Sequence, residues 1–272
     1  RKSPIEERLD LTTEDLIKPE DMVVTISRLG YAKTQPLEVY QSQRRGGVGK
    51  TAASVKEEDF VEQLIVANTH DTLLCFSNLG KVYWLKVYEI PQASRVAKGR
   101  PLVNLIQLDS EERITSLLNV ESFDAVGFVF MATMKGVVKK TPLEDFRLPR
   151  KSGKRAIKLD TKDELVGTKI TDGKKHIMLI SDAGKAVYFD EKDSRPLGRD
   201  TRGVKGIELE DEQKVISLMV PGSEDEILTV SENGFGKKSR ITDFRKTKRG
   251  AKGVIAMQLS ERNGKLISAV QV

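Results

Sequence analysis

Clusters of Lys and Arg beside glycine are the residues in this sequence that are best suited to chemistry. The first cluster is Gln43, Arg44, Arg45, Gly46, Gly47, Val48, Gly49 and Lys50. Four later clusters contribute Arg95, Lys98, Arg100, Arg150, Lys151, Lys154, Arg155, Arg199, Arg202, Lys205, Lys246, Lys248, Arg249 and Lys252. Lys and Arg neutralise phosphate groups, and glycine lets backbone N–H groups approach them closely. The clusters therefore predict phosphate-binding loops.

The spacing of these clusters indicates that they act together. Each cluster contains or precedes a glycine, and these glycines recur about every 50 residues. A single basic loop is usually only a solvated surface feature. Equivalent positions in a cyclic or spiral array lie on one rim, so five loops in register predict a basic belt. The sequence shows neither a recognition helix nor a regular aromatic ladder, so we expect the belt to hold the backbone of double-stranded DNA without reading bases.

Two segments resemble catalytic motifs but lack residues or features that those motifs require. The segment 46–51 resembles the end of a nucleotide-binding P-loop, but that motif needs a glycine where this chain has Arg44. Paired carboxylates such as Glu57 and Glu58 recur at the same place in other repeats, which is typical of structural turns. We find no nucleophile beside a base. We therefore expect no catalytic residue and no cofactor on this chain.

The composition excludes other classes of site. The only cysteine, Cys75, stands in an apolar run and is predicted to be a core residue. Because the chain has only two histidines besides this cysteine, no zinc site can be built from Cys and His. The formal net charge is +6, which is compatible with a polyanionic partner. No apolar run approaches the ~20 residues of a membrane helix, and the first residues lack a signal peptide. These features predict a cytoplasmic protein without a membrane partner.

The elements that must position the basic loops repeat five times. An apolar strand, a Ser or Thr, two further residues and a glycine come before a second strand, and the glycines are Gly30, Gly80, Gly136, Gly184 and Gly234. This is the chemistry of a β-hairpin, because glycine accepts the left-handed conformation of the turn. Four strands in each repeat of ~50 residues, without helical periodicity between them, predict an all-β fold of stacked or radial sheets. Kelch and WD40 patterns do not fit.

The repeats also divide the chain. We expect an N-terminal arm or linker over residues 1–20 and one β domain over 21–272, with repeats near 21–70, 71–120, 121–170, 171–220 and 221–272. Their third strands are expected at 51–55, 101–106, 156–159 and 254–259. One repeat cannot bury its apolar faces alone, so neighbouring repeats must pack together. Whether the array closes into a ring or forms a spiral stays open.

The segment from Gln43 to Gly49 resembles the gyrase A box, the Gln-Arg-Arg-Gly-Gly-Lys-Gly motif of the C-terminal DNA-wrapping domain of DNA gyrase A. The resemblance extends over essentially the whole chain. It implies a β-pinwheel whose adjacent blades exchange strands and whose rim wraps DNA, in support of ATP-driven negative supercoiling. It also implies gyrase B and the rest of gyrase A as partners. The catalytic residues of this type II topoisomerase lie elsewhere, so this chain alone is expected to be no enzyme and to be monomeric.

Two departures from the family pattern matter. Val48 stands where the family usually has Lys, which removes one phosphate contact, and five repeats are visible where the family usually has six. Two alternatives stay open. One is the equivalent domain of topoisomerase IV, whose box is typically degraded, so that the almost intact box of this chain favours gyrase. The other is a propeller scaffold that binds an acidic protein partner.

Overall fold

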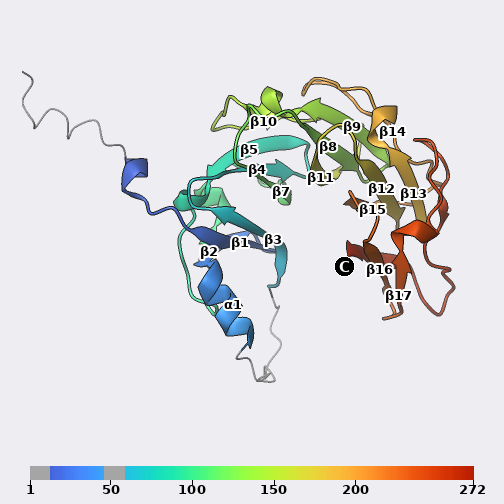
Figure 1. Ribbon diagram of the computed structural model, residues 1–272, viewed down its shortest axis with the longest axis horizontal. Coiled ribbons are helices and arrows are strands. Elements are labelled where there is room, and N and C mark those ends of the chain that lie inside the picture. Colours follow the sequence, from blue (N-terminus) through green and yellow to red (C-terminus); the bar gives the residue numbers. More distant parts are fainter. Residues whose placement is uncertain (1–12, 46–58) are drawn as a thin grey trace, which may run out of the picture.

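The computed structural model describes residues 13–45 and 59–272, and nearly all of its regular structure is antiparallel β-sheet (Figure 1). The predicted all-β fold is confirmed. The five predicted hairpins are β1 (Asp21–Ser27) with β2 (Tyr31–Pro36), β4 (Thr72–Ser77) with β5 (Lys81–Lys86), β8 (Phe128–Thr133) with β9 (Val137–Pro142), β12 (His176–Ser181) with β13 (Lys185–Asp190), and β16 (Glu226–Ser231) with β17 (Gly236–Arg240).

Each hairpin turn is built by the Ser or Thr and the glycine that the sequence pattern singles out. In the third hairpin the N–H of Gly136 donates to the carbonyl oxygen of Thr133 at 3.0 Å, and the Thr133 hydroxyl accepts from the N–H of Val137 at 3.1 Å. Gly136 has a φ of 89°, which a residue with a Cβ rarely adopts. The local sequence therefore determines the turn.

A further strand joins each hairpin on the side of its first strand. These five strands, which lie toward the inside of the arc in Figure 1, are β3 (Val61–Asn68), β7 (Ile114–Val120), β11 (Leu165–Thr171), β15 (Val215–Met219) and β19 (Leu266–Gln271). Each pairs antiparallel with the first strand of its own repeat.

The outermost strand of a sheet comes from the following repeat. These exchanged strands are β6 (Arg100–Pro101), β10 (Lys154–Arg155), β14 (Val204–Lys205) and β18 (Val254–Ile255), which pair with β2, β5, β9 and β13. The longer third strands expected at 101–106, 156–159 and 254–259 are wrong, because only two residues pair before the chain turns toward its own sheet. The expected strand at 51–55 lies outside the described residues.

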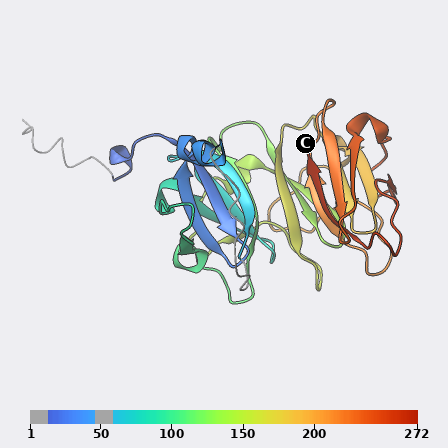
Figure 2. The same cartoon turned by 90° about the horizontal axis from the view of Figure 1, so that it is seen from below.

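Four sheets thus have four strands, and the fifth, β17-β16-β19, has three in the part of the chain that the structure describes. The sheets follow one another along an arc from the first, in blue, to the fifth, in red (Figure 1). Seen from below, they stand face to face in the same order (Figure 2).

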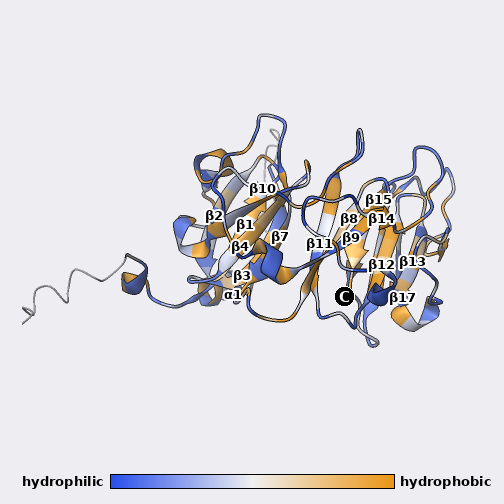
Figure 3. Ribbon diagram, turned by 90° about the horizontal axis from the view of Figure 1, so that it is seen from above, coloured by the Kyte–Doolittle hydropathy of each residue, from blue (hydrophilic) through white to orange (hydrophobic). Residues whose placement is uncertain are grey.

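The hydrophobic core lies between successive sheets. On β4, Leu73 and Cys75 belong to the cluster shared with β1, whereas Leu74 and Phe76 belong to the cluster shared with β8. This alternation follows from the two-residue period of a strand. Apolar residues accordingly follow the strands, and polar residues gather in the loops (Figure 3). Cys75 is fully buried, which confirms its prediction as a core residue.

One α-helix, α1 (Leu37–Arg45), lies in the described residues and packs on β1 and β2. The sequence pattern did not predict it, because the polar segment carries no apolar periodicity. Its Leu, Glu, Gln and Arg residues are nevertheless good helix formers. Short 3₁₀ turns are η2 (Thr13–Leu16), η3 (Val87–Glu89), η4 (Leu102–Asn104), η5 (Leu143–Phe146), η6 (Glu191–Asp193) and η7 (Ile241–Asp243). Across 13–45 and 59–272, no helix is long and apolar enough to cross a membrane.

Candidate nucleic-acid interface

Four of the five predicted basic loops lie within the described residues, and each leads into or follows an exchanged strand. Because β6, β10, β14 and β18 form the outer edges of four successive sheets, the loops lie along the outside of the arc (Figure 1). We call the fourteen cations of these loops the basic perimeter: Arg95, Lys98, Arg100, Arg150, Lys151, Lys154, Arg155, Arg199, Arg202, Lys205, Lys246, Lys248, Arg249 and Lys252.

Most side chains of the basic perimeter reach solvent. Eleven are exposed, and the other three, Lys154, Arg199 and Arg249, are half-buried. Ion pairs with described carboxylates involve only Arg155, with Asp200 at 2.6 Å, and Arg202, with Asp160 at 3.2 Å. The remaining exposed cations have no such counter-charge and are therefore able to meet phosphate groups.

Arg199 is half-buried because its guanidinium joins two loops. Its Nε donates to the carbonyl oxygen of Asp145 at 2.9 Å, and its Nη1 donates to that of Arg155 at 3.2 Å. Arg155 in turn forms the ion pair with Asp200, and this contact lowers the pKa of the Asp200 carboxyl. The loops around 150–155 and 199–202 are consequently tied to each other.

Arg249 repeats this arrangement between the next two loops. Its Nε donates to the carbonyl oxygen of Asp193 at 2.9 Å, and its Nη1 donates to that of Lys205 at 2.6 Å. Arg199 and Arg249 were predicted only as DNA-binding residues. Their guanidinium groups also hold the loops in place, which sequence spacing could not reveal.

Lys154 lies close to two other cations of the basic perimeter. Its ammonium lies 5.7 Å from the centre of the Trp84 ring, whose indole N–H donates to the carbonyl oxygen of Phe146 at 2.8 Å. Burial, together with the neighbouring charges of Arg199 and Arg150, lowers the pKa of Lys154. Two cations are therefore close enough to act on Lys154, and an anion placed there would relieve this repulsion.

The predicted box falls at the edge of the described residues. Gln43, Arg44 and Arg45 form the last residues of α1 rather than part of a loop. Gly46, Gly47, Val48, Gly49 and Lys50 lie outside the described residues. The box therefore begins on a helix that packs on the first sheet.

The glycines of the basic loops serve strand exchange. A Cβ on Gly153 would lie 2.7 Å from the Tyr83 ring, and one on Gly253 would lie 2.6 Å from the carbonyl oxygen of Ala186. Both neighbours belong to the sheet of the preceding repeat. The prediction that these glycines open the backbone to phosphate is thus not needed to explain them, since close packing against that sheet already requires them.

The predicted acidic turns lie beside the hairpin turns of the sheets. In one of them the Asp59 carboxylate accepts from the N–H of Leu29 at 2.9 Å, and in another the Asp163 carboxylate accepts from the N–H of Lys135 at 2.9 Å. These carboxylates cap turns, as expected of structural residues. Within the part of the chain that the structure describes, no group of three or more His, Cys, Asp or Glu could hold a metal ion.

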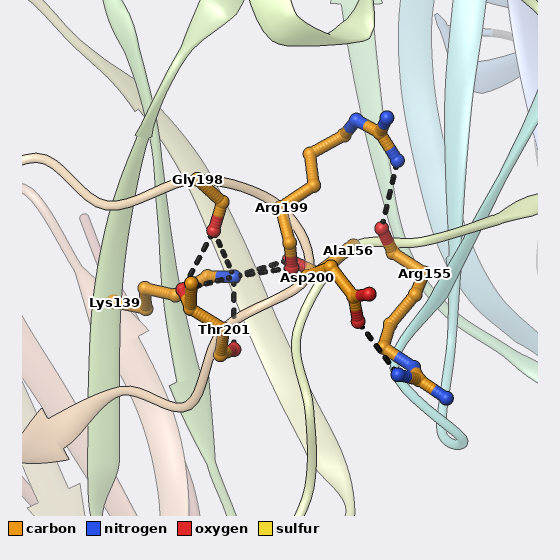
Figure 4. A network of polar contacts seen from close by, with 7 residues as sticks. All are labelled: Lys139, Arg155, Ala156, Gly198, Arg199, Asp200 and Thr201. Atoms are coloured by element: carbon orange, nitrogen blue, oxygen red, sulfur yellow. Dashed lines mark hydrogen bonds and ion pairs between the residues drawn. The ribbon is translucent and has the colours of Figure 1, made fainter.

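Sequence reasoning missed two lysines on strands. Lys139 on β9 is fully buried, and its ammonium donates to backbone carbonyl oxygens of two basic loops (Figure 4). Lys33 on β2 donates to carbonyl oxygens of the loop that carries Arg95. One signal was available: both lysines stand three residues after a hairpin glycine, at a position where a strand of the core would otherwise be apolar.

Comparison with known proteins gives a family and several relatives. The chain matches the DNA gyrase C-terminal domain, beta-propeller family over residues 21–68, 71–121, 127–172, 175–221 and 225–272. It is 51% identical over 263 residues to the DNA gyrase A protein of Escherichia coli K12, and 50% identical over 264 residues to that of Klebsiella oxytoca. Each alignment covers 97% of this chain and 30% of the relative.

Two solved structures resemble the fold. A C-terminal domain of DNA topoisomerase IV superposes with a TM-score of 0.76 at 27% identity, over 94% of this chain and 79% of that chain. A C-terminal domain of DNA gyrase A gives a TM-score of 0.74 at 27% identity, over 93% and 83%. The chain spans about 30% of the length of the curated relatives it matches.

Proposed function

This chain belongs to the DNA gyrase C-terminal domain family, and on that premise we propose that its basic perimeter binds double-stranded DNA and wraps it along the outside of the arc. The observation that carries the proposal is the placement of four basic loops at the outer edges of four successive sheets. A duplex that follows this edge meets cations at each sheet in turn. The match to the family supports the same reading.

The proposed contacts are to phosphate and carry no sequence preference. Arg and Lys on the perimeter replace the counterions of the DNA backbone, so affinity is set by electrostatics. Smooth bending of 20–30 base pairs costs on the order of 1–6 kcal/mol. A single patch would bind straight DNA, whereas a series of cations around a curved edge offsets the cost of bending at each step.

We propose the box as the strongest anchor, with Arg44 and Arg45 as its main cations. The two arginines are consecutive residues at the end of α1, and Lys50 follows in the chain. Val48 carries no charge where the family usually has a lysine. Lys50 is the nearest cation in the sequence that could compensate for the missing lysine.

In the whole enzyme, this domain would present a wrapped DNA segment for strand passage and so support ATP-dependent negative supercoiling. The rest of gyrase A would carry the catalytic residues and gyrase B would hydrolyse ATP, and this chain would use no cofactor. The isolated domain would be monomeric and would act in the cytoplasm on the nucleoid.

The equivalent domain of topoisomerase IV is the second candidate, because one such domain has a similar fold. The relatives of this chain at about half identity are gyrase A proteins, while the topoisomerase IV domain shares 27%. We therefore favour gyrase. A scaffold for an acidic protein would use the same cations, but it would not need them to follow a curved edge.

Religation of nicked circular DNA on the protein tests the proposal. With the 272-residue chain present at low salt, the religated circles should show a shifted linking number that grows with protein. Arg44→Ala with Arg45→Ala should abolish this shift more readily than binding, whereas Lys174→Ala, an exposed lysine outside the basic perimeter, should leave both unchanged. An unmoved topoisomer distribution would refute wrapping. Failure to bind random-sequence duplex would instead favour the protein scaffold.

A further inference from the structure

A single buried ammonium connects two neighbouring loops of the basic perimeter. Nζ of Lys139 lies 2.6 Å from the carbonyl oxygen of Ala156, 2.9 Å from that of Gly198, 2.7 Å from that of Arg199 and 3.2 Å from that of Thr201 (Figure 4). The residue is 0% exposed. These acceptors, with the Thr201 hydroxyl at 3.4 Å, surround the three N–H donors that a lysine has in its protonated form.

The acceptors belong to loops from different repeats. Ala156 directly follows Lys154 and Arg155 of β10, and the other three acceptors precede Arg202. The Arg199–Arg155 hydrogen bond and the Arg155–Asp200 ion pair join the same loops nearer the surface. Lys139 is thus the buried end of a connection whose exposed end carries the cations proposed to meet DNA.

The same device occurs two sheets earlier. Nζ of Lys33 lies 3.1, 2.9 and 2.9 Å from the carbonyl oxygens of Ser94, Arg95 and Ala97. Like Lys139, Lys33 is the third residue after its hairpin glycine. The carbonyls are also equivalent in the repeat, since in each basic loop they lie five, four and two residues before the glycine of that loop, Gly99 or Gly203.

The other three sheets have different residues at the position of Lys33 and Lys139. The corresponding residue is Tyr83 in the second sheet and Val187 in the fourth, and both are buried. In the fifth sheet it is Lys237, which is exposed, and no hydrogen bond or ion pair of its ammonium with the described residues is found. Lys237 therefore offers a control lysine at an equivalent position that holds no loop of the described residues.

We propose that Lys139, and with it Lys33, are positioning residues that set the spacing of neighbouring basic loops for wrapping. This inference rests on the proposed function. A loop whose backbone is held by a buried ammonium presents its cations at a fixed distance from those of the next sheet. DNA must then bend to meet both, whereas a loosened loop can move to meet straight DNA. Loss of the ammonium should therefore affect bending more than binding.

The test compares Lys139→Met, Lys33→Met and Lys237→Met in the full 272-residue chain, by affinity for random duplex and by linking-number shift per bound protein. We expect Lys139→Met to lower the shift about twofold or more, with affinity changed less than about threefold. Lys33→Met should act in the same direction, and Lys237→Met should change neither quantity. Near-UV circular dichroism reports whether each variant is folded.

The outcomes separate this inference from the proposed function. If the unsubstituted chain itself fails to shift the linking number, wrapping is wrong. If it does shift and folded Lys139→Met matches it, or if shift and affinity fall in equal proportion, the positioning role is wrong and the lysine only supports the fold. Should Lys139→Met not fold, the half-buried Lys33 decides: an unchanged shift in Lys33→Met overturns the inference, and a selective loss supports it.

Discussion

Arg249 forms the same two hydrogen bonds to backbone carbonyl oxygens that Arg199 forms one repeat earlier. In both, Nε donates at 2.9 Å to the carbonyl oxygen of an acidic residue in the preceding repeat, Asp193 for Arg249 and Asp145 for Arg199. Each guanidinium also reaches the exchanged strand that precedes its own loop. The cations of the basic perimeter are therefore of two kinds, those that hold loops and those that only face solvent.

Substitutions should separate these two kinds. Arg199→Ala and Arg249→Ala should each lower the free energy of unfolding by about 1–3 kcal/mol, because each half-buried guanidinium loses two charged hydrogen bonds to backbone carbonyl oxygens. Lys248→Ala, at an exposed side chain, should change the free energy of unfolding by less than about 0.5 kcal/mol. It should also make the slope of log affinity for DNA against log salt concentration shallower by about 0.9. Urea unfolding and binding across a salt series measure both. Equal stabilities for all three variants would show that the arginine contacts do not hold the loops.

A pair of hairpin glycines should show what strand exchange requires. Gly80 has a φ of 76°, and a Cβ there would lie 2.7 Å from the carbonyl oxygen of Ile157 in the exchanged segment; Gly234 has a φ of 84° with nothing within 4 Å. Gly234→Ala should cost about 1–2 kcal/mol of stability from conformation alone. Gly80→Ala should cost about 1–3 kcal/mol more, because the exchanged segment must move. Denaturant unfolding compares them, and equal losses would contradict a role for Gly80 in exchange.

The hairpins could be predicted because their signal is local. Within eight residues, an apolar strand, a Ser or Thr and a glycine determine the turn, as Thr133 and Gly136 show. The order of the repeats then places equivalent loops at equivalent sites. That reasoning located the basic loops, and the structure brings the four described ones to the same outer edge.

What the sequence could not reveal depends on contacts between distant residues. A two-residue exchanged strand has too short a pattern to be recognised, and its partner lies in another repeat. The position of Lys139 in a core strand marks it as unusual, but its acceptors lie 17 or more residues away and cannot be identified from the sequence. Helix α1 was missed because its polar composition gives no periodic signal.

Two residues with left-handed backbone conformation offer a gain of stability. Lys162 and Glu212 have φ values of 61° and 69° and are the only non-glycine residues with positive φ in the described part of the chain. Replacing either residue by glycine relieves about 1–2 kcal/mol of backbone strain. The greater conformational freedom of glycine in the unfolded chain offsets about 0.5–1 kcal/mol of this gain. Each variant should therefore be more stable by up to about 1.5 kcal/mol. Asp211→Gly, at a neighbouring residue without positive φ, should instead lose stability by denaturant unfolding; a loss in all three would contradict the account.

Lys139 should make stability depend on pH above neutrality. Burial lowers its pKa from 10.5 to about 7, with Asp200 and Asp145 opposing the shift and Arg199 adding to it. The carbonyl oxygens around Nζ also favour the protonated form and so limit the effect. Between pH 7 and 10.5 the unfolded chain binds a proton that the folded chain has released. The free energy of unfolding should therefore rise with pH in this window, by at most about 1.4 kcal/mol per pH unit.

The measurement is urea unfolding at several pH values from about 7 to about 9 for the unsubstituted chain and for Lys139→Met, because the difference between them cancels the groups that titrate in both. That difference should grow in favour of the unsubstituted chain as pH rises. Lys237→Met, which removes an exposed lysine at the equivalent position, should give a difference that does not change with pH. A flat difference for Lys139→Met as well would mean that the carbonyl cage, and not burial, sets the protonation of Lys139, and that its ammonium stays charged through this range.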